Sequence, residues 1–258
     1  WALFVGGLVP ALIFGVALGN VLQGVPFRFT PEMRMIYEGT FLGLLNPFAL
    51  LAGVVSSAMI TFHGAVYLAH RTEGEIQQRS VHAALLFGVI ALAAFAAAGL
   101  WVQAIPGYVI AAGADPAGLP NPLAKEVVRE AGAWMANYRH QPLLWAVPAL
   151  AFLGGLAAMW AVRAGRTFFA FWASSVMIAG IIGTAGVAMF PFVMPSSTDL
   201  RSSLTVWDSV SSHLTLTVMF WATLIFMPLI TVYTSWAYKV MAGKVTKAYI
   251  LENEKQAY

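Results

Sequence analysis

Five histidines are the side chains of this chain best suited to ligate haem or a metal ion, because imidazole is the commonest metal ligand in proteins. His63 lies in the middle of a long apolar run, whereas His70, His82, His140 and His213 lie near the ends of such runs. No two of them combine a same-face helical spacing with a carboxylate, so the pattern of a helical metal site is missing. We expect His63 to be a hydrogen-bonded packing residue. A functional role is the alternative, since an ionisable group in lipid is a functional candidate by default.

Trp207 and Asp208 precede the last apolar run, in the stretch Trp207-Asp-Ser-Val-Ser-Ser-His213. The position of Asp208 suits an N-cap, in which its carboxylate accepts backbone amides and is stabilised by the helix dipole. A proton or quinone role for Asp208 is the alternative and would require the carboxylate to be buried.

Two prolines follow the fifth apolar run, in Ala188-Met-Phe-Pro-Phe-Val-Met-Pro-Ser-Ser197. Pro191 and Pro195 each lack a backbone donor and should kink or end the helix. We expect Ser196 and Ser197 to satisfy carbonyls that the prolines leave free.

The segment 121–134 reads as a short amphipathic helix lying on the membrane surface. Its apolar side chains recur at helical spacing, and Lys125, Glu126, Arg129 and Glu130 can then face water. Contact of this charged face with a partner subunit is the alternative.

Composition removes several classes of protein. Hydrophobic residues make up 60% of the 258 residues and charged residues only 10%, so lipid must be the solvent. Cysteine is absent, which excludes disulfides, thiolate nucleophiles, iron–sulfur clusters and Cys-ligated zinc. The basic residues are scattered, which argues against a nucleic-acid partner. No phosphate-binding loop or nucleophile elbow is present, so we assign no catalytic residue and no metal ligand, and the cofactor-binding residues stay unassigned.

Six uncharged runs are long enough to cross a bilayer, where a backbone deprived of water must form helices. The sequence therefore predicts an all-α integral membrane protein with six transmembrane helices. The runs are 1–22, 44–69, 81–103, 142–162, 167–190 and 214–238.

The charges between these helices predict the orientation. One face carries eight basic and four acidic residues, a net charge of +4, whereas the other carries six basic and seven acidic residues, a net charge of −1. By the positive-inside rule the first face, with the C-terminus, should be cytoplasmic.

Small residues recur on some helical faces, as in Gly15 with Gly19 and the row Gly180, Gly183 and Gly186. Such faces permit close helix approach, so packing is their expected role.

Trp1 starts an apolar run without an initiator Met, and we expect the polypeptide to begin further upstream.

Five segments, taken in order, resemble subunit II of cytochrome bd-type quinol oxidases, and the likeness covers the whole chain, 1–258. They are Gly19-Asn-Val-Leu-Gln-Gly-Val-Pro-Phe27, Leu45-Asn-Pro-Phe-Ala-Leu-Leu-Ala-Gly-Val-Val-Ser56, Asn121-Pro-Leu-Ala-Lys-Glu-Val-Val-Arg-Glu-Ala-Gly-Ala-Trp134, Ala185-Gly-Val-Ala-Met-Phe-Pro-Phe-Val-Met-Pro-Ser-Ser197 and Leu204-Thr-Val-Trp-Asp208.

The resemblance implies a nine-helix subunit of two four-helix bundles plus a peripheral helix, of which this chain lacks the first three helices. The absent region includes a His-Trp-Asp motif whose carboxylate belongs to a proton path, so the resemblance assigns that role to no residue of this sequence.

The resemblance also implies a heterodimer in the bacterial cytoplasmic (inner) membrane. Subunit I would bind haem b and haem d, oxidise quinol, and reduce dioxygen with protons taken from the cytoplasm. This chain would support subunit I without binding haem. A structural quinone, lipid and small accessory subunits are further expected partners.

A multi-spanning secondary transporter, or a membrane scaffold unrelated to respiration, is the alternative. Transporters place ionisable residues and unwound helices at mid-membrane. Here the carboxylates lie at the ends of the apolar runs, and no clear inverted repeat relates the first three to the last three.

Overall fold

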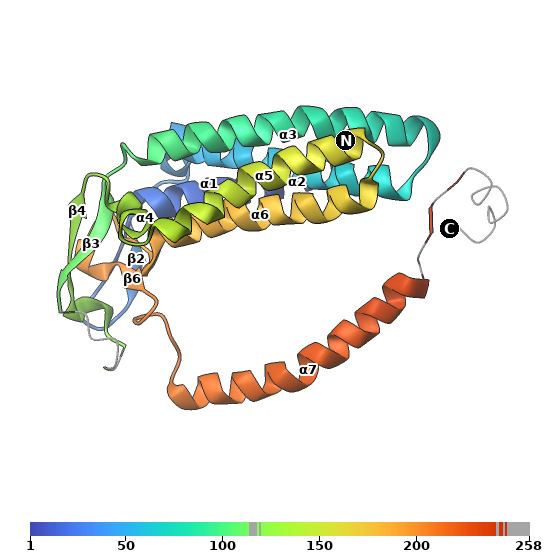
Figure 1. Cartoon of the computed structure of the whole chain (residues 1–258). Coiled ribbons are helices and arrows are strands. Elements are labelled where there is room, and N and C mark those ends of the chain that lie inside the picture. The colour runs from blue at the N-terminus through green and yellow to red at the C-terminus, as the bar shows by residue number, and fades with distance from the viewer. Residues whose placement is uncertain (114–117, 119, 241–242, 245, 247–258) are drawn as a thin grey trace.

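Six long apolar helices form most of the chain in a computed structural model, which describes residues 1–113, 118, 120–240, 243–244 and 246 (Figure 1). All six predicted membrane spans are confirmed, and with them the all-α membrane fold. The helices are α1 (Ala2–Gln23), α2 (Pro47–Arg71), α3 (Gly74–Val102), α5 (Ala146–Arg163), α6 (Thr167–Met189) and α7 (His213–Val240). A 3₁₀ turn, η4 (Pro142–Trp145), leads into α5 and extends that span.

Helices α2, α3, α5 and α6 form a four-helix bundle, and α1 packs along α2 (Figure 1). The bundle core is built mainly from small side chains, with Phe62 and Met177 as its largest fully buried members. Because lipid is as apolar as leucine, helices in a membrane associate through close packing of small residues rather than through burial of apolar surface.

Glycines set the closest helix contacts. A Cβ on Gly180 would lie 2.6 Å from the Ala151 nitrogen of α5, and one on Gly19 would lie 2.6 Å from the Ala49 Cα of α2. The predicted packing role of these two glycines is therefore confirmed. Gly186 differs, because a Cβ there would meet nothing within 4 Å.

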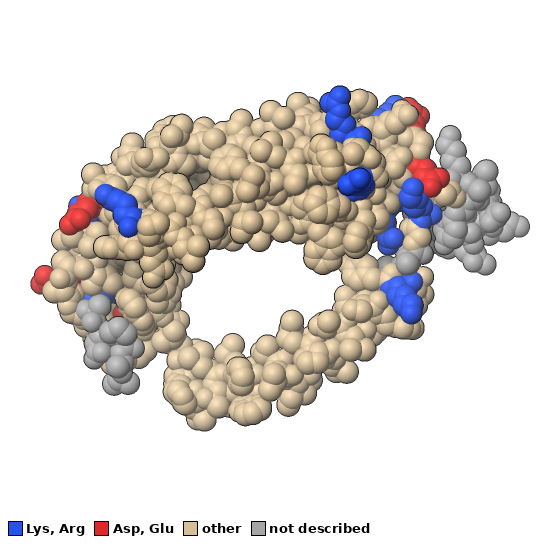
Figure 2. All heavy atoms as spheres, in the orientation of Figure 1, with Lys and Arg blue, Asp and Glu red and all other residues tan. Residues whose placement is uncertain are grey.

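The polar segments gather at the two ends of the bundle (Figure 1). The α2–α3 and α5–α6 turns and the far end of α7 share one end, where most of the Lys and Arg side chains visible in Figure 2 lie. We call this the basic end. Asp115 and residues 247–258, which contribute to the charge count, lie outside the described residues.

The opposite end carries a small domain of short strands, which we call the strand cap. Its three antiparallel pairs join β1 (Phe27–Phe29) to β2 (Met35–Tyr37), β3 (Gly107–Ala112) to β4 (Glu126–Glu130), and β5 (Phe192–Met194) to β6 (Leu204–Thr205). Short helical segments complete it: η1 (Leu42–Leu44), η2 (Pro122–Ala124), η3 (Ala133–Met135), α4 (Ala136–His140) and η5 (Leu200–Ser202). Its core includes Phe27, Tyr108, Trp134 and Phe192.

The expected amphipathic helix over 121–134 is wrong. Pro122 does begin a helical turn, but η2 ends at Ala124, and β4 then pairs with β3. Along β4 only Val127 is buried, whereas Glu126, Arg129 and Glu130 are exposed. Two adjacent β-branched valines favour a strand, and a partner strand outweighs the weak helical periodicity of a short segment.

Helix α7 stands apart from the bundle. None of its residues is buried, and Figure 2 shows an open space between it and the other helices. Within the described part of the chain, ion pairs tie the segments at its two ends to the rest. Asp208 pairs with Lys125 in the strand cap, and Lys244 pairs with Glu73 at 3.2 Å at the basic end. Both sides of α7 therefore remain available to lipid or to other transmembrane helices.

Replacing Gly180 by valine should push α5 and α6 apart. Overpacking of this kind costs about 1–3 kcal/mol, so thermal unfolding of the purified complex should shift to lower temperature. Gly64→Val is the matched control, because a Cβ at Gly64 meets nothing within 4 Å. Equal melting temperatures for the two variants would contradict the close approach at Gly180.

Candidate functional site

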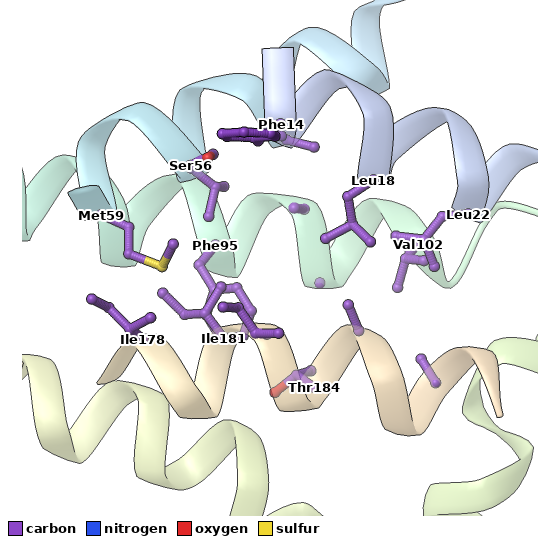
Figure 3. A pocket seen from close by; sticks show the side chains of 18 of the residues that line it. Phe14, Leu18, Leu22, Ser56, Met59, Phe95, Val102, Ile178, Ile181 and Thr184 are labelled. Carbon is purple, nitrogen blue, oxygen red and sulfur yellow. The ribbon is translucent and has the colours of Figure 1, made fainter. Parts of the chain in front are cut away.

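A partly open cavity of about 440 Å³ lies between α1, α2, α3 and α6, in the half of the bundle nearer the strand cap (Figure 3). In Figure 3, Phe14 and Leu18 of α1 lie across the cavity from Ile178 and Ile181 of α6, and Phe95 of α3 lies between them. The volume falls within the range of roughly 300–1,000 Å³ typical of small-molecule sites.

The cavity wall is almost wholly apolar. Ser56 and Thr184 are the polar side chains in it, and the Thr184 hydroxyl already donates to the Gly180 carbonyl at 2.7 Å. Small residues on α2, α3 and α6 leave the space open: Ala52, Ala98, Gly99, Ala185 and Ala188. A hydrocarbon chain fits such a wall, whereas a charged group would lose its hydration without compensation.

The cavity does not suit haem, because its wall includes no histidine. Met59 supplies the sulfur in the wall, but the lining side chains include no Lys or Arg to pair with haem propionates. Within the described part of the chain, no group of three or more His, Asp or Glu side chains could hold a metal ion.

His63 lies outside the cavity, between α2 and α6, with its Nδ1 2.8 Å from the Ser174 hydroxyl. That hydroxyl also lies 2.8 Å from the Phe171 carbonyl, which can only accept a hydrogen bond. The Ser174 hydroxyl therefore lies within hydrogen-bond distance of both the His63 ring and the Phe171 carbonyl. The hydrogen bond expected of a packing residue is present; a further role for His63 stays a prediction.

The remaining histidines do not converge on one place. His70 contacts the Thr167 hydroxyl at 2.9 Å at the basic end, and His82 lies on α3 nearby. His140 ends α4 and His213 begins α7, both near the strand cap.

Asp208 is part of a buried ion pair in the strand cap. Its Oδ2 accepts from the Lys125 ammonium at 2.6 Å and from the Thr205 hydroxyl and amide at 2.6 and 3.1 Å. Lys125 is 3% exposed and also donates to the Pro122 carbonyl at 2.9 Å. The pair therefore joins the segment before β4 to the segment that leads into α7.

The expected N-cap role of Asp208 is wrong. Helix α7 begins at His213, and the Ser212 hydroxyl accepts the Thr215 amide at 3.3 Å instead. Sequence reasoning placed Lys125 on a solvated helix face and so missed the pair, because its partners lie 83 residues apart.

Pro191 was expected to end the fifth span, and α6 does end at Met189. The expected role of Ser196 is wrong, because its hydroxyl donates to the Phe27 carbonyl of β1 rather than to a carbonyl of α6. The side-chain amide of Asn137 in α4 donates hydrogen bonds to carbonyls at the end of α6. The acceptors are the carbonyls of Val187 at 2.8 Å and Phe190 at 2.7 Å.

The neighbouring candidates contribute to the same cap. The Ser197 amide donates to the Val25 carbonyl at 3.0 Å, which links the segment after β5 to the one before β1. Trp207 packs edge-on against Phe190, with ring centroids 6.4 Å apart. Neither residue lines the apolar cavity.

Among the charged residues of β4, Arg129 makes side-chain contacts with other described residues. Its guanidinium lies over the Tyr108 ring, 5.1 Å from the centroid, and donates to the Gln23 carbonyl at 3.2 Å. Burial raises the pKa of the Tyr108 hydroxyl, and the positive charge of Arg129 opposes part of that rise. Glu126 and Glu130 remain exposed, and a partner contact for them stays a prediction.

The comparisons with known proteins agree with one another. The family described as cytochrome bd terminal oxidase subunit II matches residues 1–241. The chain is 49% identical over 259 residues to cytochrome bd-I ubiquinol oxidase subunit 2 of Escherichia coli (strain K12), covering 100% of this chain and 68% of that protein. It is 44% identical over 258 residues to the probable cytochrome oxidase subunit 2 of Haemophilus influenzae, with the same coverage. A Bacillus subtilis protein, cytochrome bd ubiquinol oxidase subunit 2, is 25% identical over 247 residues, covering 95% of this chain and 63% of its own length.

Removing one charge of the buried pair should be much more damaging than removing both. Asp208→Asn leaves Lys125 buried without a counter-charge, which typically costs about 3–5 kcal/mol, whereas well-packed apolar replacement of both partners is often neutral. We expect Lys125→Met with Asp208→Leu to recover most of the stability lost in Asp208→Asn, measured as the melting temperature of the purified complex.

Glu38→Gln is the matched control, because the Arg28–Glu38 pair has the same 2.6 Å separation but is 45% and 33% exposed. An exposed pair contributes about 0–1 kcal/mol. If Asp208→Asn melts no earlier than Glu38→Gln, the Lys125–Asp208 pair does not hold the strand cap together.

Proposed function

Because the chain belongs to the cytochrome bd terminal oxidase subunit II family, it is a subunit of a quinol oxidase, and we propose that it is the subunit without haem. The family implies an oxidoreductase complex that contains haem and a partner oxidase subunit. With its six apolar helices, the chain is a multi-pass protein of the bacterial inner membrane. A secondary transporter, or a scaffold unrelated to respiration, is not favoured.

One observation carries the proposal: the lining of the apolar cavity includes no histidine to ligate a haem, and the bundle histidine His63 lies outside that cavity, where it contacts Ser174. Haem b and haem d then reside in the partner, subunit I, where they supply the chemistry of dioxygen reduction. The contribution of this chain is structural, since its helices position the partner and exclude water from that side of the complex.

The apolar cavity is the proposed site of a structural quinone. Its wall suits an isoprenoid tail, because side chains such as Phe14, Leu18, Phe95 and Ile181 present hydrocarbon on every side. Ser56 is the polar side chain of the wall for which the described residues provide no hydrogen bond, so its hydroxyl is available to a quinone oxygen.

We also propose which end of the chain faces each side of the membrane. The basic end, with the C-terminus, faces the cytoplasm by the positive-inside rule, and the strand cap faces the outer side. Quinol is then oxidised at the side of the strand cap, while the protons for dioxygen reduction come from the cytoplasm.

Subunit I is the proposed neighbour of α7. This helix has no buried residue, and among the described residues the ion pairs that fix it lie beyond its ends, so it can pack against another membrane subunit without disturbing the bundle. Small accessory subunits and lipid would cover the remaining apolar helix faces.

Replacing His63 or His213 should leave the haem content of the complex intact. We expect His63→Ala and His213→Ala complexes to contain the same amounts of haem b and haem d per complex as the parent, measured by pyridine haemochrome spectra. Gel filtration provides the control for assembly. Disappearance of one haem from an assembled complex would assign a ligand to this chain.

Filling the apolar cavity should displace the structural quinone. Ala185→Phe places a ring in the cavity, whereas Ala179→Phe puts the same ring on an exposed position of α6. Quinone extracted from purified complexes should fall well below one per complex in the first variant only. An unchanged quinone content in Ala185→Phe would refute the assignment of the cavity.

A further inference from the structure

A second hollow of about 380 Å³ lies on the other side of α6, where its last turn meets α4 and η4. We call it the α4–α6 groove. It is lined by Asn137, His140, Gln141, Leu144, Gly186, Val187 and Phe190. The apolar cavity uses Thr184, Ala185 and Ala188 of the same helix. With 100° between successive residues these sets point in nearly opposite directions, so the two hollows are separate.

The groove has an apolar wall and a polar rim. Leu144, Val187 and Phe190 supply the wall, while His140 and Gln141 are exposed at the end of α4. Neither His140 nor Gln141 has a side-chain hydrogen bond to another described residue. A molecule in the groove would therefore meet hydrocarbon on one side and two unengaged polar groups on the other, which is the usual composition of a ligand site.

The position of the groove matches the membrane interface. It lies where α6 ends and where η4 leads into α5, next to the strand cap. Aromatic residues mark this level, since Trp145 is 51% exposed and stacks near Tyr138, with ring centroids 5.1 Å apart. Tryptophan and tyrosine concentrate where headgroups begin.

The charge at the rim of the α4–α6 groove determines whether a phospholipid or a quinol fits it better. The lining residues include no Lys or Arg, and the neighbouring Arg139 donates to the carbonyls of Gly132 and Met135. A phospholipid phosphate would thus find no Lys or Arg side chain among the lining residues. A quinol or quinone headgroup is uncharged and exchanges hydrogen bonds with imidazole and amide groups, so it fits this rim better.

We infer that the α4–α6 groove is a holding site for the quinol substrate at the outer face of the membrane. His140 and Gln141 would bind the oxygens of the headgroup, and the tail would leave along Leu144 and Val187 into the lipid. The inference concerns binding alone, with oxidation taking place in the partner subunit. It rests on the quinol-oxidising function of the complex and is independent of what occupies the apolar cavity.

Gly186 allows the groove to be closed without moving the helices. Because a Cβ there meets nothing within 4 Å, the side chain of Gly186→Leu can extend into the groove. Gly64→Leu is the matched control, since Gly64 is also helical, exposed and open. His140→Ala with Gln141→Ala removes the polar groups and keeps the groove open, which provides an independent variant if Gly186→Leu does not assemble.

The probe is a short-chain benzoquinone carrying a photoreactive azide, applied to the intact purified complex, with labelled peptides identified by mass spectrometry. We expect labelling within 137–144 or 186–190 that excess unlabelled short-chain quinone suppresses. Gly186→Leu should lower this labelling about five-fold or more, because a steric block excludes the ligand. The His140→Ala, Gln141→Ala variant should lower it as well, and Gly64→Leu should not.

Three results would overturn the inference. They are unchanged labelling in Gly186→Leu, labelling confined to other parts of the complex, and equal suppression by a phospholipid such as phosphatidylglycerol, which would make the groove a lipid site. Oxidase activity with the same quinol separates this test from the function of the complex. An active parent complex without groove labelling removes the inference alone, whereas an inactive one challenges the quinol oxidase itself.

Discussion

Lipid offers no hydrogen-bond partner to a backbone amide, and this constraint determines most of the structure. Each membrane segment satisfies its amides within its own helix, and irregular backbone is concentrated at the two ends. Where the chain leaves α6 at Pro191, the amide of Asn137 binds the carbonyls of Val187 and Phe190. The strand cap follows the same rule. Its short antiparallel pairs hydrogen-bond backbone amides and carbonyls that lie outside the helices.

The same constraint explains the apolar cavity and the α4–α6 groove. Helices that associate through glycine and alanine approach closely where small residues oppose each other, as at Gly180 and Ala151. Where a small residue has no opposing neighbour, as at Ala185 and Gly186, space remains. In water such space would weaken the fold, whereas in a membrane an amphiphile can fill it. Both hollows lie toward the strand cap, the side at which the complex is proposed to oxidise quinol.

The sequence predicts the helices well because an uncharged run of about 20 residues has few other structures available in lipid. It does not predict contacts between distant polar residues. Lys125 and Asp208 each have an ordinary local interpretation, as a solvated side chain and as an N-cap, and only the fold brings them together. The segment 121–134 shows the same limit, since its strand depends on pairing with β3. The cavity wall consists mostly of apolar residues from four helices, and nothing in their spacing along the chain distinguishes them from packing residues.

The central claim is that this bundle provides shape and hydrocarbon surface while the redox centres lie in the partner. It is tested most directly by the reduced-minus-oxidised absorption spectrum of membranes that contain this chain without its partner subunit. We expect no haem b or haem d signal in proportion to the chain. A stoichiometric haem spectrum that is lost when His63 or His213 is replaced would contradict it.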